Sequence, residues 1–273
     1  MCGRYVMARA TSDLVALGDA ETNEELVLRQ SWNVAPTAEV PILVAHADDG
    51  GAGVTRRIHV ARWGLVPPWA KELSVGSRAF NARSETVASK PTFRAAVRAR
   101  RCAVPVEGYY EWKTPEPGAK GPDGRAAKKQ PYYVHPAGAG DGEGPVIWFA
   151  GLYEWWQDPE AKAAGEDAWV LSTTVLTMAA PDADDDEPVL AALGQLHDRL
   201  PVPMDAETMD RWLAPDTLGS AEEADALVGE VCAGAYDVAA GWSLRPVGGA
   251  VGNVRNNGPE LIQKMREQQG TLL

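Results

Sequence analysis

The chain has 273 residues, 45% of them hydrophobic and 23% charged, and its formal net charge at pH 7 is -12. Because this usage is close to that of ordinary globular proteins, it excludes a disordered chain and a fibrous repeat. The acidic balance argues against general nucleic-acid binding, since contacts of Lys and Arg with phosphates supply most of the non-specific affinity.

The first half of the chain predicts a β-hairpin followed by a helix and a strand. Val40–Ala45 and Thr55–Val60 are short apolar runs typical of strands, and the polar, glycine-bearing residues 48–53 predict the loop between them. Lys90–Arg101 has a helical spacing of apolar residues and a proline in its first turn, so we expect a helix there. Cys102–Val106 is a short apolar run that predicts the next strand.

The second half of the chain predicts further short strands mixed with helices. The expected strands are Tyr132–His135, Val146–Tyr153, Ala168–Thr174 and Ser243–Val247, and the expected helices are Val189–Leu196, Asp205–Leu213 and Ala221–Val231. Residues 114–130, rich in Gly, Pro and Lys, and the acidic residues 181–188 predict exposed loops. We therefore expect an α+β fold over residues 1–273, a single domain with an irregular mixed β-sheet or barrel-like core and peripheral helices.

The sequence also bears on the compartment and on cofactors. Charged residues interrupt the N-terminal segment, and no stretch approaches the ~18 apolar residues of a spanning helix, so we expect a cytoplasmic protein without a membrane anchor. Cys2, Cys102 and Cys232 are odd in number and far apart, which argues against a disulfide framework and against a metal site. We expect neither a metal nor an organic cofactor.

Charged residues are unevenly placed along the sequence. Arginines gather between positions 78 and 101, at Arg78, Arg83, Arg94, Arg98, Arg100 and Arg101. Acidic residues gather at 182–187 and at 222–225. A local basic face on an acidic protein is one expectation from this pattern, and the solvated surface of a helix is the other.

Cys2 is the most informative residue, because removal of Met1 would leave it with a free α-amine beside its thiol. An α-amine titrates near ~7.7–8, well below the ~10.4 of a lysine, so an appreciable fraction is neutral and nucleophilic at physiological pH. Such an amine condenses with an aldehyde to an imine. The thiol can then add to the imine and close a five-membered thiazolidine, so the residue predicts an aldehyde trap.

Met-Cys-Gly-Arg-Tyr at the start of the chain opens an ordered set of short segments. The others are Asn33–Pro36, Asn81–Thr86, Gly108–Trp112, His197–Pro201 and Gly252–Leu261. In this order they resemble the motifs of the SOS response-associated peptidase family, whose members process abasic sites. The resemblance covers essentially the whole chain. It implies that family's fold, a thiazolidine crosslink between Cys2 and abasic sites in single-stranded DNA, and association with the nucleoid during DNA damage.

The resemblance also implies roles for three further catalytic residues. Glu111 is the family's active-site glutamate and would transfer protons to and from the Cys2 amine. The alternative is that it is an ordinary carboxylate at the end of a strand. His197 would assist ring opening and imine formation, and its bland interpretation is a structural histidine. Asn81 would orient the amine or the sugar hydroxyl, or it would simply end a strand by bonding its own backbone.

Candidate DNA contacts lie within or near the same motifs. Arg4, Arg83 and Arg199 are suited to bidentate contacts with phosphates, with surface ion pairs as the alternative, especially for Arg199 beside Asp198. Trp63, Trp69 and Trp112 could stack on bases or wedge the strand open, and we favour the last two because most of the ten tryptophans must be core. Pro36 would shape the pocket wall.

Three other functions fit parts of the sequence. Amidotransferases with an N-terminal nucleophile also begin Met-Cys-Gly, and their cysteine attacks glutamine with its own amine as base. A cysteine peptidase would pair Cys2 with His197, oriented by Glu111 or Asn81, and self-removal of Met1 would be such an activity. A non-catalytic single-strand binder would keep its activity in Cys2→Ala. We favour covalent capture, because an amidotransferase leaves the later motifs unexplained.

Overall fold

The computed structural model describes residues 2–21, 26, 28–48, 53–121, 123–138 and 144–265. Its centre is a closed barrel in which neighbouring strands pair in the order β10, β4, β3, β6, β9 and back to β10. These strands are β3 (Glu39–Ala47), β4 (Val54–Trp63), β6 (Arg101–Val106), β9 (Ile147–Gln157) and β10 (Trp169–Ala179). Only the pairing of β4 with β10 is parallel within this ring, so the barrel is a mixed sheet.

A second sheet packs against the barrel and carries the start of the chain. Its strand order is β13, β8, β7, β1, β2, with all pairings antiparallel. The strands are β1 (Tyr5–Met7), β2 (Ser31–Val34), β7 (Gly108–Lys113), β8 (Gln130–Pro136) and β13 (Trp242–Pro246). The buried rings of Tyr109 and Trp242 from this sheet meet Phe149 of the barrel edge-on, which joins the two sheets in one core.

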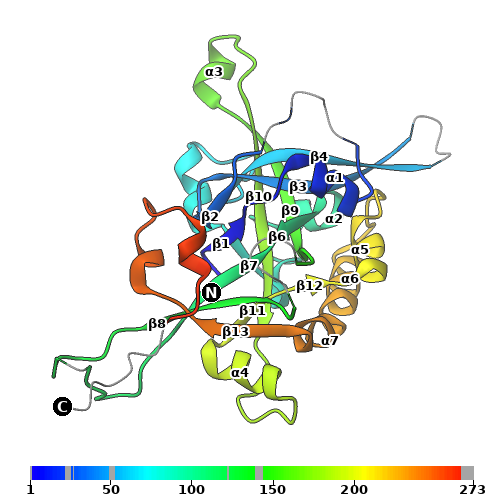
Figure 1. Cartoon of the computed structure of the whole chain (residues 1–273). Coiled ribbons are helices and arrows are strands. Elements are labelled where there is room, and N and C mark those ends of the chain that lie inside the picture. Colours follow the sequence, from blue (N-terminus) through cyan, green and yellow to red (C-terminus); the bar gives the residue numbers. More distant parts are fainter. Residues whose placement is uncertain are drawn as a thin grey trace, which may run out of the picture.

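Helices and short strands surround these two sheets (Figure 1). The α-helices are α1 (Thr11–Leu17), α2 (Arg94–Ala99), α3 (Pro159–Ala163), α4 (Pro188–Leu196), α5 (Ala206–Leu213), α6 (Ala221–Ala233) and α7 (Ala235–Ala240). Short strands add to β10 and β9: β5 (Asn81–Arg83), β11 (Arg199–Pro201) and β12 (Pro203–Met204). Short 3-10 helices are η1 (Leu73–Arg78), η2 (Ser84–Thr86), η3 (Gly249–Gly252) and η4 (Pro259–Ile262). No helix within the described ranges is long and apolar enough to cross a membrane.

The expected α+β fold, a single domain with a mixed, barrel-like core, is confirmed, and most expected elements are present with shifted ends. The hairpin is β3 with β4, although residues 49–52 of its loop lie outside the described residues. The helix expected over Lys90–Arg101 is wrong in extent: residues 90–93 form a turn, α2 covers only Arg94–Ala99, and Arg101 already belongs to β6. Pairing of Arg101 with Leu152 in the barrel decides that boundary.

The sequence patterns missed several elements that matter for the site. They are β1, β2 and β5, each four residues or shorter, and the arm formed where β9 and β10 extend together to α3. Figure 1 shows this arm projecting from the barrel, with α3 at its tip. Such short strands carry too few residues to show a period of two, so their pairing partners rather than their own sequence define them.

Candidate functional site

The N-terminal strand β1 brings Cys2 to Glu111. Tyr5 pairs with Tyr109 in the antiparallel register of β1 and β7, and Tyr110 donates its backbone N–H to Arg4 O at 2.8 Å. Residues that precede Tyr5 therefore run beside residues that follow Tyr109. Cys2 and Glu111 are both buried, 2% and 5% exposed. Two residues that are 109 positions apart in the sequence thus share one interior site.

The surroundings of Cys2 keep its thiol protonated. Burial is the main cause that raises the pKa of the Cys2 thiol, and the nearby Glu111 carboxylate raises it further. Burial also raises the pKa of the Tyr5 and Tyr109 hydroxyls, with smaller contributions from Cys2 to both. The sulfur therefore sits among buried phenols beside one carboxylate, which opposes formation of a thiolate.

Asn81 holds the backbone of Cys2 from the opposite side. It is the first residue of β5 and lies opposite Val175 in the parallel pairing with β10. Its Nδ2 donates to Cys2 O at 2.8 Å. Its Oδ1 is buried, and within the described part of the chain it accepts no hydrogen bond. A buried acceptor beside the backbone of Cys2 is suited to bind an ammonium or hydroxyl group.

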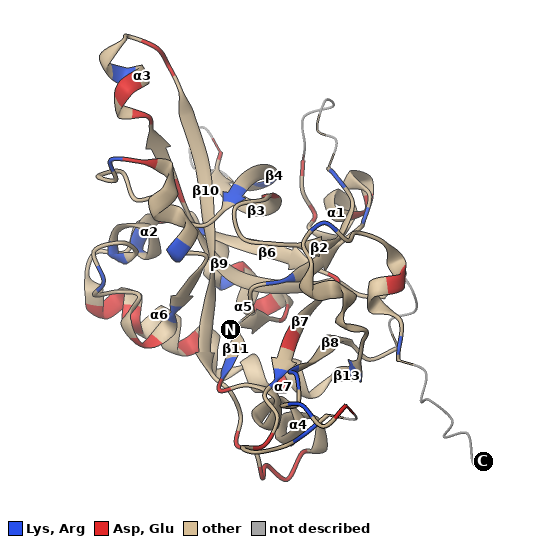
Figure 2. Cartoon of the chain, turned by 90° about the vertical axis from the view of Figure 1, so that its left-hand side faces the viewer, with Lys and Arg blue, Asp and Glu red and all other residues tan. Residues whose placement is uncertain are grey.

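His197 lies at the end of α4, where the chain turns into β11. Its Nδ1 is 3.0 Å from the backbone N–H of Arg199 and 2.6 Å from Asp198 Oδ1. A neutral Nδ1 accepts from that N–H, whereas a protonated Nδ1 donates to the carboxylate, so each protonation state of the ring has its own partner. Figures 1 and 2 both place β11 beside the N-terminal end of the chain. The imidazole ring therefore lies on the segment next to the start of the chain.

Arg199 forms a bidentate ion pair with Glu85 of η2. Its Nη1 and Nη2 lie 2.6 and 2.9 Å from the two carboxylate oxygens, and Nη2 also donates to Thr177 O at 2.6 Å. The hydrogen bonds from Arg199 lower the pKa of the Glu85 carboxyl. The partner of Arg199 is thus Glu85, and Asp198 pairs with His197. This ion pair connects the segment after β5 to β11.

Arg4 and Asn33 connect the first motif of the chain to the last one. Arg4 Nη1 donates to Asn33 Oδ1 at 2.9 Å and to Val251 O at 2.8 Å, and its guanidinium carbon lies 6.0 Å from the centre of the Trp112 ring. Asn33 Nδ2 in turn faces the carbonyls of Val251, Asn253 and Asn256 at 2.8–3.3 Å. Sequence reasoning placed Asn33 in a motif but gave it no role.

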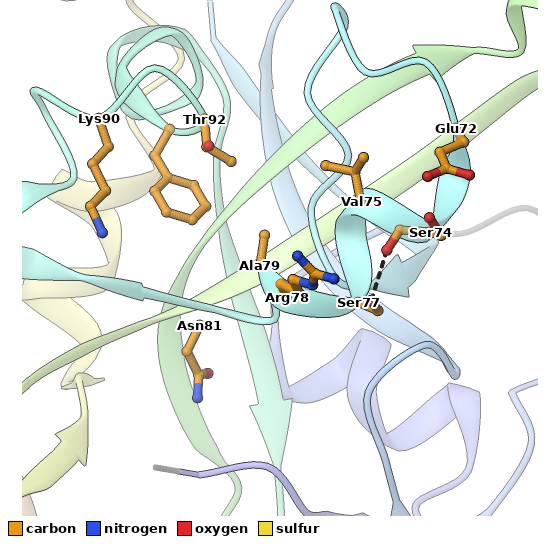
Figure 3. A pocket seen from close by; sticks show the side chains of 10 residues that line it. Glu72, Ser74, Val75, Ser77, Arg78, Ala79, Asn81, Lys90 and Thr92 are labelled. Carbon is orange, nitrogen blue, oxygen red and sulfur yellow. Dashed lines mark hydrogen bonds between the residues drawn. The ribbon is translucent and has the colours of Figure 1, made fainter.

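A polar cavity of about 500 Å³ opens beside Asn81. In Figure 3, Lys90 and Thr92 come from the segment that leads into α2 and lie across from Arg78 and Ser77 of η1, whereas the Asn81 side chain points away from them on the other side of its strand. Lys90 and Arg78 are exposed. Glu72 also lines the cavity, so its wall carries two cations and one carboxylate, and Lys90 and Arg78 are the groups suited to bind a phosphate. Lys90 escaped the sequence analysis, which considered arginines alone.

Half of the arginine cluster serves the fold and is not available as a basic face. Arg101 is 5% exposed and donates to the carbonyls of Val97, Arg98, Trp212, Ala214 and Asp216. Arg98 donates to Leu218 O and Gly219 O, and Arg100 pairs with Glu154 at 2.7 Å. Arg78, Arg83 and Arg94 stay exposed. Figure 2 shows basic positions around α2 and an acidic stretch along the neighbouring α6.

The aromatic and proline candidates occupy three different settings. Trp63 is fully buried and donates to Phe80 O, so the idea that it stacks on bases is wrong. Trp112 is half-buried beneath Arg4, and Trp69 is 61% exposed at a separate hollow. Pro36 is half-buried in the turn between β2 and β3, where Thr37 adopts a φ of 78°. Of these side chains, Trp112 lies nearest in sequence to Glu111 and Trp69 is the most open.

The described residues contain no group of three or more His, Cys, Asp or Glu side chains placed to hold a metal ion. Cys2, Cys102 and Cys232 are free thiols, and Cys102 is buried in the barrel beside Thr173. The candidate groups of the site are the amine and thiol of Cys2 once Met1 is removed, the carboxylate of Glu111, the amide of Asn81 and the imidazole of His197. These groups suit proton transfer and addition to a carbonyl.

Comparison with known proteins gives a family match over most of the chain. The sequence model of the family described as SOS response associated peptidase (SRAP) matches residues 1–254. The abasic site processing protein YoqW of Bacillus subtilis (strain 168) is 30% identical over 264 residues, which are 96% of this chain and 99% of that protein. The abasic site processing protein HMCES of Gallus gallus is 27% identical over 254 residues, which cover 86% of this chain and 66% of that protein.

Solved structures share the fold. A protein from Bacteroides thetaiotaomicron, solved by X-ray crystallography, superposes with a TM-score of 0.70 at 20% sequence identity, covering 97% of this chain and 100% of that one. A second, from Bordetella bronchiseptica, gives a TM-score of 0.58 at 21% identity over 90% of this chain and 100% of that one. At these identities the likeness concerns the arrangement of strands and helices.

Proposed function

The chain belongs to the SOS response associated peptidase (SRAP) family, and from this membership we propose that it captures abasic sites in single-stranded DNA through a thiazolidine crosslink at Cys2. The names of the relatives support the lesion as substrate, since YoqW and HMCES are both abasic site processing proteins. The observation that carries the proposal is the position of Cys2, a residue able to become a 1,2-aminothiol, buried beside the carboxylate of Glu111.

The α-amine of Cys2 acts first in this mechanism. Removal of Met1 frees the amine, whose ordinary pKa of ~7.7–8 leaves a nucleophilic fraction at neutral pH. The thiol is the weaker candidate for the first step because its raised pKa keeps the proton on sulfur. The amine attacks the C1 aldehyde of the opened sugar, and loss of water gives the imine. Asn81 would orient the amine through its Oδ1, which is buried and accepts no hydrogen bond within the described residues.

Ring closure then requires transfer of the thiol proton. Sγ adds to the imine carbon, a C–S bond forms, and the electron pair of the C=N bond passes to nitrogen, which takes up a proton. Glu111 is the base that receives the proton from the thiol, because its carboxylate lies close enough to raise the thiol pKa. The product is a thiazolidine, and nothing leaves in this second step.

His197 is proposed to open the sugar before capture. An abasic deoxyribose is mostly a closed hemiacetal, so ring opening needs a proton at the ring oxygen and a base at the hydroxyl. The imidazole has a partner in each protonation state, the Arg199 N–H when neutral and Asp198 when protonated. It can therefore deliver a proton to the sugar and recover it with a hydrogen-bond partner in each state.

The DNA strand is proposed to contact the groups that surround the Cys2 site. Arg83, the last residue of β5, is exposed. Arg4 lies over the ring of Trp112, the residue that follows Glu111. Arg199 would act from β11, and Pro36 would limit the pocket wall. Arg4 Nη1 and both Nη atoms of Arg199 bond to protein partners, and the Nε of each is buried, so the contacts proposed with the strand would use only the remaining Nη hydrogens.

A denaturing gel tests the capture. Mature protein mixed with single-stranded DNA that bears an abasic site should yield a heat-stable adduct. Cys2→Ala should abolish it, and Cys2→Ser should give only a reversible imine that borohydride traps. A heat-stable adduct of equal yield with Cys2→Ala would overturn the proposal, and glutamine hydrolysis without adduct formation would favour the amidotransferase.

We also propose that Met1 is removed by the protein itself as a maturation step. Self-removal would use the same site, since the bond to be cut joins Met1 to Cys2. Intact-mass measurement of the wild-type protein and of Glu111→Gln, made in the same cells, tests this. Loss of Met1 from both proteins to the same extent would instead assign the removal to a cellular aminopeptidase.

A further inference from the structure

Three of the ten tryptophans are exposed, and all three line one hollow. Trp69, Trp155 and Trp169 are 61%, 44% and 51% exposed, whereas the other seven are buried or half-buried. The hollow measures about 340 Å³ and is also lined by Lys71 and Lys162. Exposed large apolar side chains are ordinary when they are scattered, but a group of three indole rings marks an interaction surface. We call these three side chains the tryptophan platform.

The register of the arm places two members of the tryptophan platform side by side. Trp169 of β10 lies opposite Gln157 of β9, so Trp155, two residues before Gln157, is a diagonal neighbour of Trp169 on the same face. Trp156 points to the other face, where it is buried against Val66 and Ala70. Its indole N–H donates to Ala70 O at 2.9 Å, which ties the arm to the segment that carries Trp69.

The faces of the three rings are open. Among the aromatic pairs of the described residues, none joins two members of the tryptophan platform, so the rings do not cover one another. Trp169 donates its indole N–H to Asp167 Oδ1 at 2.7 Å, and this bond fixes the edge of the ring while leaving its face free. Exposed indole rings that do not stack on one another are suited to stack on other flat rings.

The charged residues that line the hollow, and the segment that links it to the cavity beside Asn81, indicate that nucleobases are the rings that stack there. Lys71 and Lys162 are the charged residues among the described side chains that line the hollow, and the Asp167 carboxylate bonds to Trp169 at its rim. Trp69 also precedes η1, which carries Arg78 at the cavity beside Asn81. In Figures 1 and 2 the arm extends away from the N-terminal end of the chain. Aromatic rings with cations, reached from the Cys2 site along one segment, form a track for a strand of nucleotides.

We infer that the tryptophan platform stacks on bases of single-stranded DNA at one side of the lesion, as a second binding surface outside the Cys2 pocket. This inference rests on the proposed single-stranded DNA substrate and adds a contact made to bases rather than to the sugar. Stacking tolerates any base, so it would hold the strand without restricting the sequence around the lesion. It would also give an acidic protein an affinity for DNA that depends less on phosphate contacts.

The test compares two ligands that differ only in their bases. Fluorescence anisotropy measures binding of an oligothymidylate and of a strand of equal length made of base-less tetrahydrofuran phosphates. In the double variant Trp155→Ala/Trp169→Ala we expect the half-saturating concentration of oligothymidylate to rise about tenfold or more, with a much smaller change for the base-less strand. Trp155→Tyr/Trp169→Tyr, which keeps two aromatic faces, should bind oligothymidylate within about threefold of wild type.

Leu17→Ala on α1 is the control, because Leu17 is 46% exposed away from the arm. Equal binding of oligothymidylate by wild type and the double alanine variant would overturn the inference. If the variant loses a dimer that the wild type forms, while its DNA binding is unaltered, the inference is overturned and the tryptophan platform binds a second copy of the chain instead. Oligothymidylate carries no aldehyde, so its binding is independent of crosslinking. If the wild type forms no crosslink with abasic DNA but binds oligothymidylate in a tryptophan-dependent way, only the proposed capture chemistry is contradicted.

Discussion

The buried amide of Asn33 determines how strongly the start of the chain is held to the segment after β13. Its Nδ2 carries two hydrogens and faces three carbonyls at 2.8–3.3 Å, so two hydrogen bonds form at a time, and its Oδ1 accepts one from Arg4. A neutral hydrogen bond contributes about 1 kcal/mol net, and one to a charged group about 1.5–3 kcal/mol. Asn33→Ala should therefore lower the free energy of unfolding by about 3.5–5 kcal/mol.

Urea unfolding followed by tryptophan fluorescence measures this loss. Asn33→Asp keeps the acceptor for Arg4 but turns a carboxylate toward the carbonyls, so it should still cost about 2 kcal/mol or more. The control is Gln195→Ala, because this exposed amide donates a single hydrogen bond to Ala183 O and should cost less than about 1 kcal/mol. A loss below about 1 kcal/mol in Asn33→Ala would refute the reasoning, since the network would then contribute no more than a surface amide.

Three further outcomes follow from the site and the fold. Glu111→Gln keeps the volume of the side chain but not its basicity, so the single-turnover rate of crosslinking should fall about 100-fold or more, and a fall below about threefold would exclude a role as base. Arg199 lowers the pKa of the Glu85 carboxyl below its ordinary 4.5, so the ion pair stabilises the fold above about pH 4.5 and this stabilisation is lost as the pH falls through the lower pKa of the folded state. Arg199→Ala should therefore lose less stability on acidification, measured by urea unfolding at several pH values. An unchanged dependence of stability on pH would contradict the ion pair. Thr37→Gly should raise the free energy of unfolding by about 1 kcal/mol, because a β-branched residue at a φ of 78° is strained, and thermal unfolding at a lower temperature would contradict that.

The sequence was sufficient to select residues that lie close together in the fold. Cys2, Asn81 and Glu111 were all selected from residue type and motif, and the structure brings Cys2 into contact with the other two. Strands such as β3 and β4 were also predictable, because each is a run of apolar residues long enough to stand out. Lys90 could not be predicted, because a single lysine before a proline belongs to no pattern that marks a ligand contact.

Charge along the sequence was a poor guide to charge on the surface. Arg101 had the same weight as Arg78 in the sequence, yet one is buried among carbonyl groups and the other faces the cavity beside Asn81. The guanidinium group of Arg101 satisfies the carbonyls at the ends of α2 and α5, a use that depends on helices distant in sequence. Only the packing of those helices decides which arginines remain for a ligand.

By itself the sequence determined which groups are present: a cysteine at position 2, an ordered series of polar motifs, and apolar runs sufficient for a barrel. The tertiary structure alone decided which of them meet. Closure of the barrel through β9 and β10, the pairing of β1 with β7 and the arm that carries the tryptophan platform all depend on registers between distant segments. A local pattern specifies the face and the length of a strand, but its partner follows from the burial and hydrogen bonding of the whole chain, which no short window contains.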